Sequence, residues 1–273
     1  MAETPRGGVQ AALAEAAARF GFSDTPRLDA ELLLAHALGI DRSALLLDME
    51  RPVPAGFAAL VERRAGHEPV AYITGVRGFW TLDLAVGPGA LVPRADSETV
   101  IAAALAHFAG RPPASVLDLG TGPGTLLLAL LDEWPAARGL GIDRSAAALA
   151  YARRNARGFG DRVALVQGDW TGALAGRFDL IVANPPYIAT DETLPPEVAA
   201  HEPVSALYAG ADGLDDYRRL VPALPGLLAP GGAIVLEIGW TQAQAVGDLL
   251  RAAGLGVTEH RDLGGRSRAL LAS

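Results

Sequence analysis

The amino-acid sequence predicts an α/β protein in which a mostly parallel sheet carries helices on both faces. Three observations lead to this expectation. From residue 97 onward, segments with helical spacing alternate with short apolar segments that are typical of buried parallel strands. The first 70 residues or so show helical spacing, and residues between 72 and 88 combine glycines with short β-type stretches. We therefore expect a helical domain at residues 1–71, a β-hairpin linker at 72–90 and the sheet domain at 91–273.

Apolar spacing and end signals locate the individual elements. In the amino-terminal part, helical spacing covers residues 11–20, 28–38 and 57–64, and Gly39 ends the second of these helices. The sheet domain is expected to contain helices at 97–107, 125–133, 146–156, 217–228 and 242–252. Its strands are expected at 115–118, 140–143, 163–166, 178–183 and 232–238, followed by two more near 256–260 and 268–271.

The composition excludes several kinds of chemistry. All 23 basic residues are arginine, and neither lysine nor cysteine occurs among the 273 residues. A chain without lysine forms no Schiff base, no pyridoxal-phosphate anchor and no Walker-A phosphate loop. A chain without cysteine has no disulfide, no thiolate metal site and no thiol nucleophile. We expect no metal site at the two His-Glu pairs either, because the H-E-x-x-H pattern fails at Ala71 and Ser205.

Charge and hydropathy limit the expected partners. The formal net charge of −8 argues against direct binding to duplex nucleic acid, which usually requires a basic surface. The longest apolar runs, such as residues 126–131, are far shorter than the roughly 20 residues that span a bilayer. Residues 1–6 show no secretory signal. We therefore expect a cytoplasmic protein without a membrane partner.

A glycine-rich loop follows the first strand of the sheet domain. Asp118 precedes Gly120, Gly122 and Gly124, which are spaced G-x-G-x-G and lead into the next helix. Glycines at this position allow a tight turn and a close approach of the backbone to a ligand. A dinucleotide fingerprint would have its third glycine where Thr125 stands. The spacing therefore favours a nucleoside cofactor lying over the loop.

An acidic residue, Asp143, ends the next expected strand, 23 residues after Gly120. A carboxylate at this place accepts hydrogen bonds from both hydroxyls of a ribose. Because NAD and S-adenosylmethionine both contain that ribose, this residue does not separate a dehydrogenase from a methyltransferase.

A proline-containing tetrapeptide follows the buried strand expected at 178–183. It consists of Asn184, Pro185, Pro186 and Tyr187. The prolines end the strand at the edge of the sheet where open α/β folds bind ligands, and they hold the neighbouring polar groups in one direction. The Asn184 side-chain oxygen and the Pro185 carbonyl can accept the two hydrogens of a planar NH₂ group, while Tyr187 offers a flat aromatic face. Such acceptors would make the nitrogen lone pair available to an electrophilic methyl group by positioning and hydrogen bonding.

The chain resembles the protein-(glutamine-N5) methyltransferases that modify peptide chain release factors. The matching segments occur in the family's order and cover roughly residues 25 to 270. They are residues 68–75, 92–98, 118–124, Asp143, 168–170, 184–187, 202–203, 212–214, 217–218 and 236–240. Two positions depart from the family pattern: Ala95 stands where proline is usual, and Pro123 stands where threonine or serine is common.

The resemblance implies a Rossmann-like class I methyltransferase sheet and a reaction that converts S-adenosylmethionine to S-adenosylhomocysteine. The implied cofactor residues are Gly120, Thr121, Gly122, Pro123 and Gly124 for the methionine part, Asp143 for the ribose, Asp169 and Trp170 for the adenine, and Asn184. The implied substrate residues are Asn184, Pro185, Pro186 and Tyr187, of which Asn184, Pro185 and Tyr187 are expected to be catalytic. The implied acceptor is the glutamine of the Gly-Gly-Gln loop in release factors 1 and 2, which the helical domain would help to dock.

Other functions remain compatible with the residues alone. An amino-methyltransferase could act on a glutamine of a ribosomal protein, or on adenine N6 or guanine N2 in nucleic acid, where a flipped base would stack on Tyr187. A non-catalytic binding module is disfavoured by the intact tetrapeptide.

Overall fold

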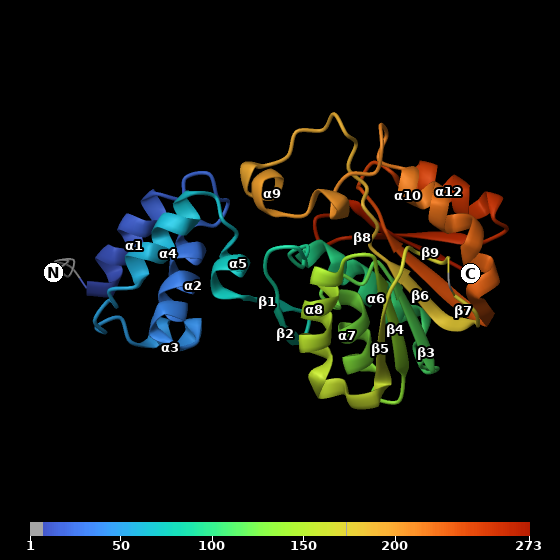
Figure 1. Ribbon diagram of the computed structural model, residues 1–273, viewed down its shortest axis with the longest axis horizontal. Coiled ribbons are helices and arrows are strands. Elements are labelled where there is room, and N and C mark those ends of the chain that lie inside the picture. Colours follow the sequence, from blue (N-terminus) through green and yellow to red (C-terminus); the bar gives the residue numbers. More distant parts are fainter. Residues whose placement is uncertain (1–7, 173) are drawn as a thin grey trace. The chain divides into compact units, whose positions relative to one another are not determined.

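The computed structural model describes residues 8–172 and 174–273. The chain divides into two compact units, shown with their elements labelled in Figure 1. The first comprises the described residues up to Val76 together with Leu194–His201. The second comprises Arg77–Thr193 and Glu202–Ser273. Residues 194–201 thus belong to the helical unit, although they come from the middle of the sheet-forming part of the chain.

The helical unit has a core of fully buried apolar side chains, among them Leu13, Phe20, Leu33 and Leu45. Its helices are α1 (Gly8–Ala18), α2 (Pro26–Leu38), α3 (Arg42–Leu47), α4 (Phe57–Ala65), α5 (Val70–Thr74) and α9 (Pro196–His201). Helix α2 ends as expected, because Gly39 adopts the left-handed conformation that closes a helix. The sequence did not predict α3, α5 or α9, which are too short for a helical period to stand out.

The second unit contains a mostly parallel sheet, as the sequence predicted. Within the described residues the strand order is β5-β4-β3-β6-β7-β9-β8. All neighbouring pairs are parallel except those that involve β9, which is antiparallel to both β7 and β8. The strands are β3 (Ser115–Leu119), β4 (Arg138–Asp143), β5 (Val163–Gln167), β6 (Phe178–Ala183), β7 (Leu228–Glu237), β8 (Val257–Arg261) and β9 (Ser267–Ala272).

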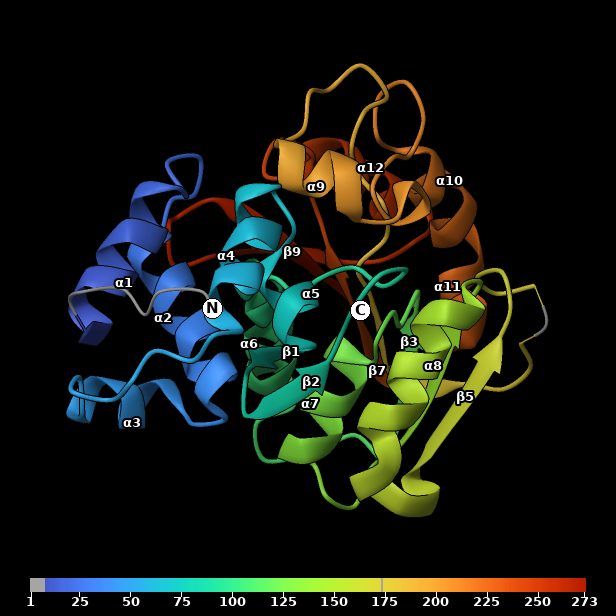
Figure 2. The same ribbon diagram turned by 60° about the vertical axis from the view of Figure 1, so that its left-hand side comes forward.

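Helices cover both faces of this sheet. They are α6 (Glu98–His107), α7 (Thr125–Glu133), α8 (Ala146–Asn155), α10 (Asp215–Leu220), α11 (Leu224–Leu227) and α12 (Ala243–Ala252). Because side chains alternate along a strand, Val116 packs with α6 and α7, whereas Leu117 packs with α10, α11 and α12. Figure 2 shows the same unit after a rotation of 60°. Burial on both faces explains why these strands are almost continuously apolar.

Two expected elements differ in detail. The helix expected at 217–228 is interrupted, since a 3₁₀ turn at Val221–Ala223 separates α10 from α11. Pro222 and Pro225 lie in this stretch, and proline cannot donate the backbone hydrogen bond that would continue a helix. In the expected linker, β1 (Val76–Phe79) and β2 (Leu82–Ala85) form the two-stranded sheet that the glycine pattern indicated, and α5 precedes them.

The order of the strands reverses between β3 and β6. From β3 the chain continues outward to β4 and β5, whereas β6 and β7 lie on the other side of β3. Open α/β sheets bind ligands at the carboxyl ends of the strands where the order reverses. The glycine loop follows β3 and the tetrapeptide follows β6, so the two motifs emerge at this point.

Candidate active site

The register of β3 and β6 brings the two sequence motifs together. Leu119, the last residue of β3, is paired with Ala183, the last residue of β6. The next residues along the chain are Gly120 of the glycine loop and Asn184 of the tetrapeptide. Two motifs that are 64 positions apart in the sequence therefore begin side by side, because the parallel strands that precede them end at paired residues.

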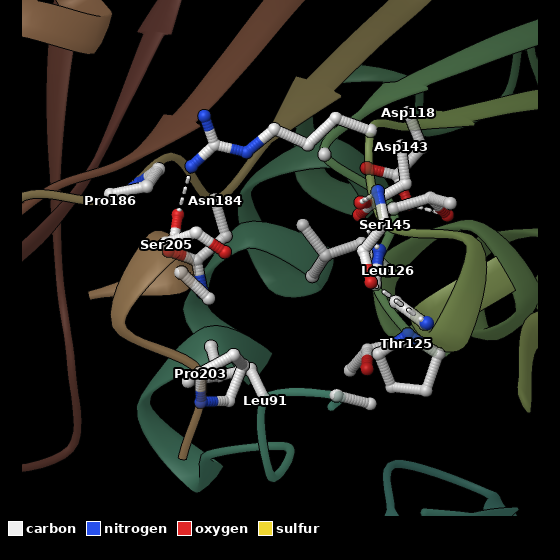
Figure 3. A pocket seen from close by; sticks show the side chains of 18 of the residues that line it. Leu91, Asp118, Thr125, Leu126, Asp143, Ser145, Asn184, Pro186, Pro203 and Ser205 are labelled. Carbon is white, nitrogen blue, oxygen red and sulfur yellow. Dashed lines mark hydrogen bonds between the residues drawn. The ribbon is translucent and has the colours of Figure 1, made fainter. Parts of the chain in front are cut away.

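A pocket of the second unit lies at these strand ends. It holds about 950 Å³ of space between its walls, including the part that is open to solvent. The loops after β3, β4, β5 and β6 line it, together with residues 89–94 and residues between 203 and 206. Figure 3 shows Asp118, Asp143 and Asn184 around this space.

Most of the residues expected to hold a cofactor line this pocket. These are Gly120, Thr121, Gly122, Pro123, Asp143, Asp169, Trp170 and Asn184, and they are joined by Pro186 of the expected substrate set. Gly124, Pro185 and Tyr187 are described residues that do not line it. Gly124 adopts a φ of +90° at the start of α7, where an added Cβ would lie 2.9 Å from Leu128. Glycine is favoured here because side chains rarely adopt this positive φ, and a Cβ would also crowd the Leu128 side chain.

The Asp143 carboxylate organises the loops around it. Its Oδ2 accepts a hydrogen bond of 2.8 Å from the Gly122 backbone N–H, and its Oδ1 accepts one of 2.7 Å from the Ser145 N–H. Each carboxylate oxygen has a second lone pair, so both remain able to accept a hydroxyl from a ligand in the pocket.

Asp118 is a functional candidate that was not predicted from the sequence as a site residue. Its carboxyl is buried, and Oδ2 accepts hydrogen bonds from the Thr121 hydroxyl at 2.7 Å and the Leu127 N–H at 3.2 Å. Oδ1 has no hydrogen-bond partner among the described residues, yet Asp118 lines the pocket. Burial raises the pKa of Asp118 to about 7. A buried acceptor without a partner beside a pocket suits a ligand with a cationic donor.

Trp170 forms a fixed wall of the pocket. Its indole N–H donates a hydrogen bond of 3.0 Å to Asp216. An added Cβ at Gly120, which has a φ of +74°, would lie 3.2 Å from the Trp170 ring. The glycine therefore allows the loop to approach the indole. The neighbouring Asp169 carboxylate is held by Arg219 at 2.6 Å.

Asn184 is held from behind by a buried polar pair. Its Nδ2 lies 3.4 Å from the Ser97 hydroxyl, which it donates to. Glu237, the last residue of β7, is 1% exposed, and the nearby Ser97 and Asn184 side chains favour its ionised form. Burial raises the pKa of Glu237 to about 7. Neither Ser97 nor Glu237 was predicted from the sequence as a site residue, and the only signal was their position in segments that match the family.

Tyr187 is fixed through its backbone. Its carbonyl accepts a hydrogen bond of 2.9 Å from Gln242, whose amide also donates to the Gly213 carbonyl at 3.2 Å. Gln242 in turn accepts from the Gly239 N–H at 3.0 Å. Burial, with a smaller contribution from the nearby Glu237, raises the pKa of Tyr187 to about 12. The phenol is therefore neutral near pH 7 and can contribute an aromatic face and a hydroxyl, but not a base.

Polar contacts hold the remaining walls. Glu202 accepts a hydrogen bond of 3.1 Å from the Val92 N–H and forms an ion pair with Arg94. The Arg144 guanidinium donates to the Ser205 carbonyl at 2.6 Å, which is the dashed line next to Ser205 in Figure 3.

At the two positions that depart from the family pattern, the Pro123 carbonyl accepts a hydrogen bond from Asn155 at 2.9 Å, and Ala95 opens the 3₁₀ turn Ala95–Ser97.

Two family models match this chain. The PrmC N-terminal domain matches residues 11–75, and the methyltransferase small domain matches residues 97–201. A curated protein of Rhodospirillum rubrum, named release factor glutamine methyltransferase, is 48% identical over 91% of this chain and 79% of its own length. A protein of the same name from Moorella thermoacetica is 44% identical over 96% of each chain. The chain belongs to the release factor glutamine methyltransferase family.

Membership of this family makes the protein an S-adenosylmethionine-dependent methyltransferase. Solved structures agree with the fold. The ribosomal protein L11 methylase of Lactobacillus delbrueckii has a TM-score of 0.51 and 24% identity, and the match covers 69% of this chain and 83% of that one. The hMettl16 catalytic domain has a TM-score of 0.57 and 17% identity, and the match covers 78% of this chain and 82% of that one. The class I methyltransferase fold is thus confirmed.

Two kinds of feature are absent from the part of the chain that the structure describes. In residues 8–172 and 174–273, no helix is both long enough and apolar enough to cross a bilayer. Over the same residues, no three side chains of His, Cys, Asp or Glu come together as a group that could hold a metal ion.

Proposed function

We propose that this enzyme transfers a methyl group from S-adenosylmethionine to the side-chain amide nitrogen, N5, of the glutamine in the Gly-Gly-Gln loop of release factors 1 and 2. The observation that carries the proposal is that one pocket is lined by both the glycine loop with Asp143 and the amide of Asn184. A methyl donor and a planar amine acceptor would meet there. The names of the relatives support the same acceptor class.

The residues of the pocket fit the cofactor. The unpartnered Asp118 Oδ1 can accept a hydrogen bond from the α-ammonium group, and the Asp143 oxygens can accept from the two ribose hydroxyls. Asp169 and the Trp170 ring, which stand at the end of β5, would flank the adenine. The backbone at Gly120 and Gly122 can approach the methionine part closely, since neither residue has a side chain. When bound, S-adenosylmethionine supplies a methyl group attached to a positively charged sulfur.

The tetrapeptide then prepares the amide for attack. An amide nitrogen is a poor nucleophile because its lone pair is delocalised into the carbonyl. Asn184 Oδ1 and the Pro185 carbonyl would accept its two hydrogens and turn the lone pair toward the methyl carbon. As the nitrogen–carbon bond forms and the sulfur–carbon bond breaks, positive charge develops on the nitrogen, and these two acceptors stabilise it. One of the nitrogen-bound protons is then released to water. No strong base is needed before transfer, which agrees with a neutral Tyr187.

A protein acceptor fits the chain better than a nucleic-acid acceptor. The formal net charge of −8 would repel a phosphate backbone. A release factor works on the ribosome, so we place the reaction in the cytoplasm, with the helical unit as the docking part.

Methyl transfer from labelled S-adenosylmethionine tests the proposal. Release factor, ribosomal protein L11 and DNA are purified and incubated separately with the enzyme. We expect label in release factor only, and none when the glutamine of its Gly-Gly-Gln loop is replaced by alanine. Label in DNA or L11 but not in release factor would overturn the proposed acceptor.

A further inference from the structure

A buried carboxyl group next to Asn184 has no role in the mechanism described above. Glu237 ends β7, the strand beside β6, and is 1% exposed. Its Oε2 has no hydrogen-bond partner among the described residues. Burial of an incompletely paired carboxyl costs folding free energy. An apolar residue at the same point of a parallel strand would avoid this cost, so the carboxyl calls for a functional reason.

Glu237, Ser97 and Asn184 lie together as one polar group beside the pocket. The Asn184 Nδ2 donates to the Ser97 hydroxyl at 3.4 Å, and the Ser97 and Asn184 side chains lie near enough to the Glu237 carboxyl to favour its ionised form. The Glu237 backbone is itself anchored, because the Tyr217 hydroxyl donates a hydrogen bond of 2.7 Å to its carbonyl. Ser97 and Asn184 line the pocket, while Glu237 lies behind them.

This arrangement determines which end of the Asn184 amide is available to a ligand. A carboxylate accepts hydrogen bonds and cannot donate them, so it selects the Nδ2 end of the amide. The Oδ1 atom of the same planar group is then directed away from Ser97 and Glu237. Without the carboxylate, a flip of the amide would exchange a hydrogen-bond acceptor for a donor at the position where an acceptor is needed.

We propose that Glu237, with Ser97, is a positioning residue that holds the Asn184 amide with Oδ1 toward the acceptor nitrogen and increases the hydrogen-bonding strength of that oxygen. The inference rests on the proposed function, in which Asn184 Oδ1 accepts a hydrogen from the substrate amide. Donation from Nδ2 to the Ser97 hydroxyl, with the Glu237 anion nearby, shifts electron density toward Oδ1, as in other chains of hydrogen bonds. The hydrogen bond from the substrate amide to Oδ1 strengthens as positive charge develops on the substrate nitrogen. The effect of Glu237 should therefore fall on kcat more than on KM.

The charges around Glu237 make its effect depend on pH. Arg268 of β9 favours the ionised carboxyl and Asp96 opposes it, while the neutral phenols of Tyr187 and Tyr217 also face it. Arg268 already pairs with Asp96 at 2.9 Å and Asp262 at 3.4 Å, which divides its charge. Because the ionised form is the one that polarises Asn184, kcat should rise as pH increases through about 7.

The variant Glu237→Gln removes the charge and preserves the shape. We expect kcat to fall about 10- to 100-fold, as for other residues that orient a reacting group, with the Kd of S-adenosylhomocysteine unchanged. The rise of kcat near pH 7 should disappear. The matched control is Glu259→Gln, because Glu259 is a carboxylate on β8 that also has a serine partner, Ser267 at 2.6 Å, and does not line the pocket. Its kcat and pH profile should equal those of the wild type.

A double-mutant cycle separates positioning from a general structural role. If Glu237 acts through Asn184, the variant Asn184→Ala/Glu237→Gln should have the kcat of Asn184→Ala alone. Additive losses, or a pH dependence retained in Glu237→Gln, would overturn the proposal. The double-mutant cycle is measured with whichever acceptor the wild-type enzyme methylates in the labelling assay. Failure to label release factor thus rejects the proposed function, whereas additivity on the true acceptor rejects the role of Glu237.

Discussion

The Asp143 Oδ2 atom accepts a hydrogen bond of 2.8 Å from the backbone N–H of Gly122. This bond joins the end of β4 to the glycine loop after β3 and connects two segments that the sequence separates by 21 positions. The carboxylate therefore shapes the loop in addition to offering acceptors to a ribose. Its loss should affect both the ligand and the loop that the ligand contacts.

The variant Asp143→Ala tests this double role. Removing a charged hydrogen-bonding group costs about 1.5–3 kcal/mol, so the Kd of S-adenosylhomocysteine should rise about 10- to 100-fold. Isothermal titration calorimetry measures the change. Asp161→Ala is the control, since that side chain is 85% exposed and pairs with Arg138 at the surface. Equal affinity in wild type and Asp143→Ala would show that Asp143 does not contact the ligand.

The variant Asn184→Ala separates chemistry from cofactor binding. Loss of an oriented acceptor for a group that gains charge in the transition state should lower kcat about 100- to 1000-fold. The Kd of S-adenosylhomocysteine should change much less, because the pocket walls at Asp118 and Asp143 are intact. Single-turnover methylation and calorimetry give the two quantities. Equal losses in both would identify Asn184 as mainly a cofactor-binding residue.

Cofactor affinity should depend on pH through Asp118. In the free protein its pKa is raised to about 7, so the carboxyl is increasingly protonated as pH falls below that value. A cationic donor at Oδ1 requires the ionised form, and binding should therefore weaken as pH decreases from 8 to 6 and release protons over the same range. Asp118→Asn should bind more weakly at pH 8 and lose this part of the pH dependence. A cofactor Kd of the wild-type enzyme that stays constant from pH 6 to 8 would contradict the role of Asp118 as the acceptor for a cationic donor.

Gly213 supports the tetrapeptide from outside the pocket. It has a φ of +71°, and an added Cβ would lie 2.2 Å from the Tyr187 carbonyl oxygen, which is a backbone atom and cannot turn away. Gly213→Ala should displace Tyr187 and lower both kcat and the melting temperature. At Gly254 the φ is +86° but no atom lies within 4 Å of the added Cβ. Gly254→Ala should thus cost only the backbone strain of about 1–2 kcal/mol and leave kcat unchanged. Similar kcat values for the two variants would exclude a role of Gly213 in the site.

The helical unit depends on a buried arginine. The Arg64 side chain is 5% exposed and forms ion pairs with Asp29 at 2.8 Å and Glu197 at 2.7 Å, which joins α2, α4 and α9. Arg64→Met leaves Asp29 buried without its cation and should destabilise this unit by about 3–5 kcal/mol. Hydrogen exchange of α2 and α4 measures the effect. The exposed ion pair between Arg138 and Asp161 serves as the comparison, and Arg138→Met should lower the free energy of unfolding by less than about 1 kcal/mol. Unchanged protection in Arg64→Met would contradict this prediction.

Local patterns were sufficient for much of the fold and part of the site. The alternation of apolar strands and helices predicted the parallel sheet, because strands buried on both faces must be apolar along their length. The glycine spacing and the tetrapeptide predicted the loops that line the pocket, since ligands bind at the carboxyl ends of parallel strands. Short helices such as α9 were not predicted, because one and a half turns show no period.

The hydrogen-bond partners of the site residues could not be predicted from local sequence patterns. Glu237 lies near Asn184 only because β7 lies beside β6, and Asp143 reaches Gly122 only because β4 lies beside β3. Ser97 reaches Asn184 from the turn that precedes α6. Gly124 matched the same loop motif as its neighbours, yet it does not line the pocket and lies with a φ of +90° directly before α7. A residue's type and its place along the chain follow from local sequence. Hydrogen-bond partners depend on the order and register of strands, which arise from contacts between distant segments.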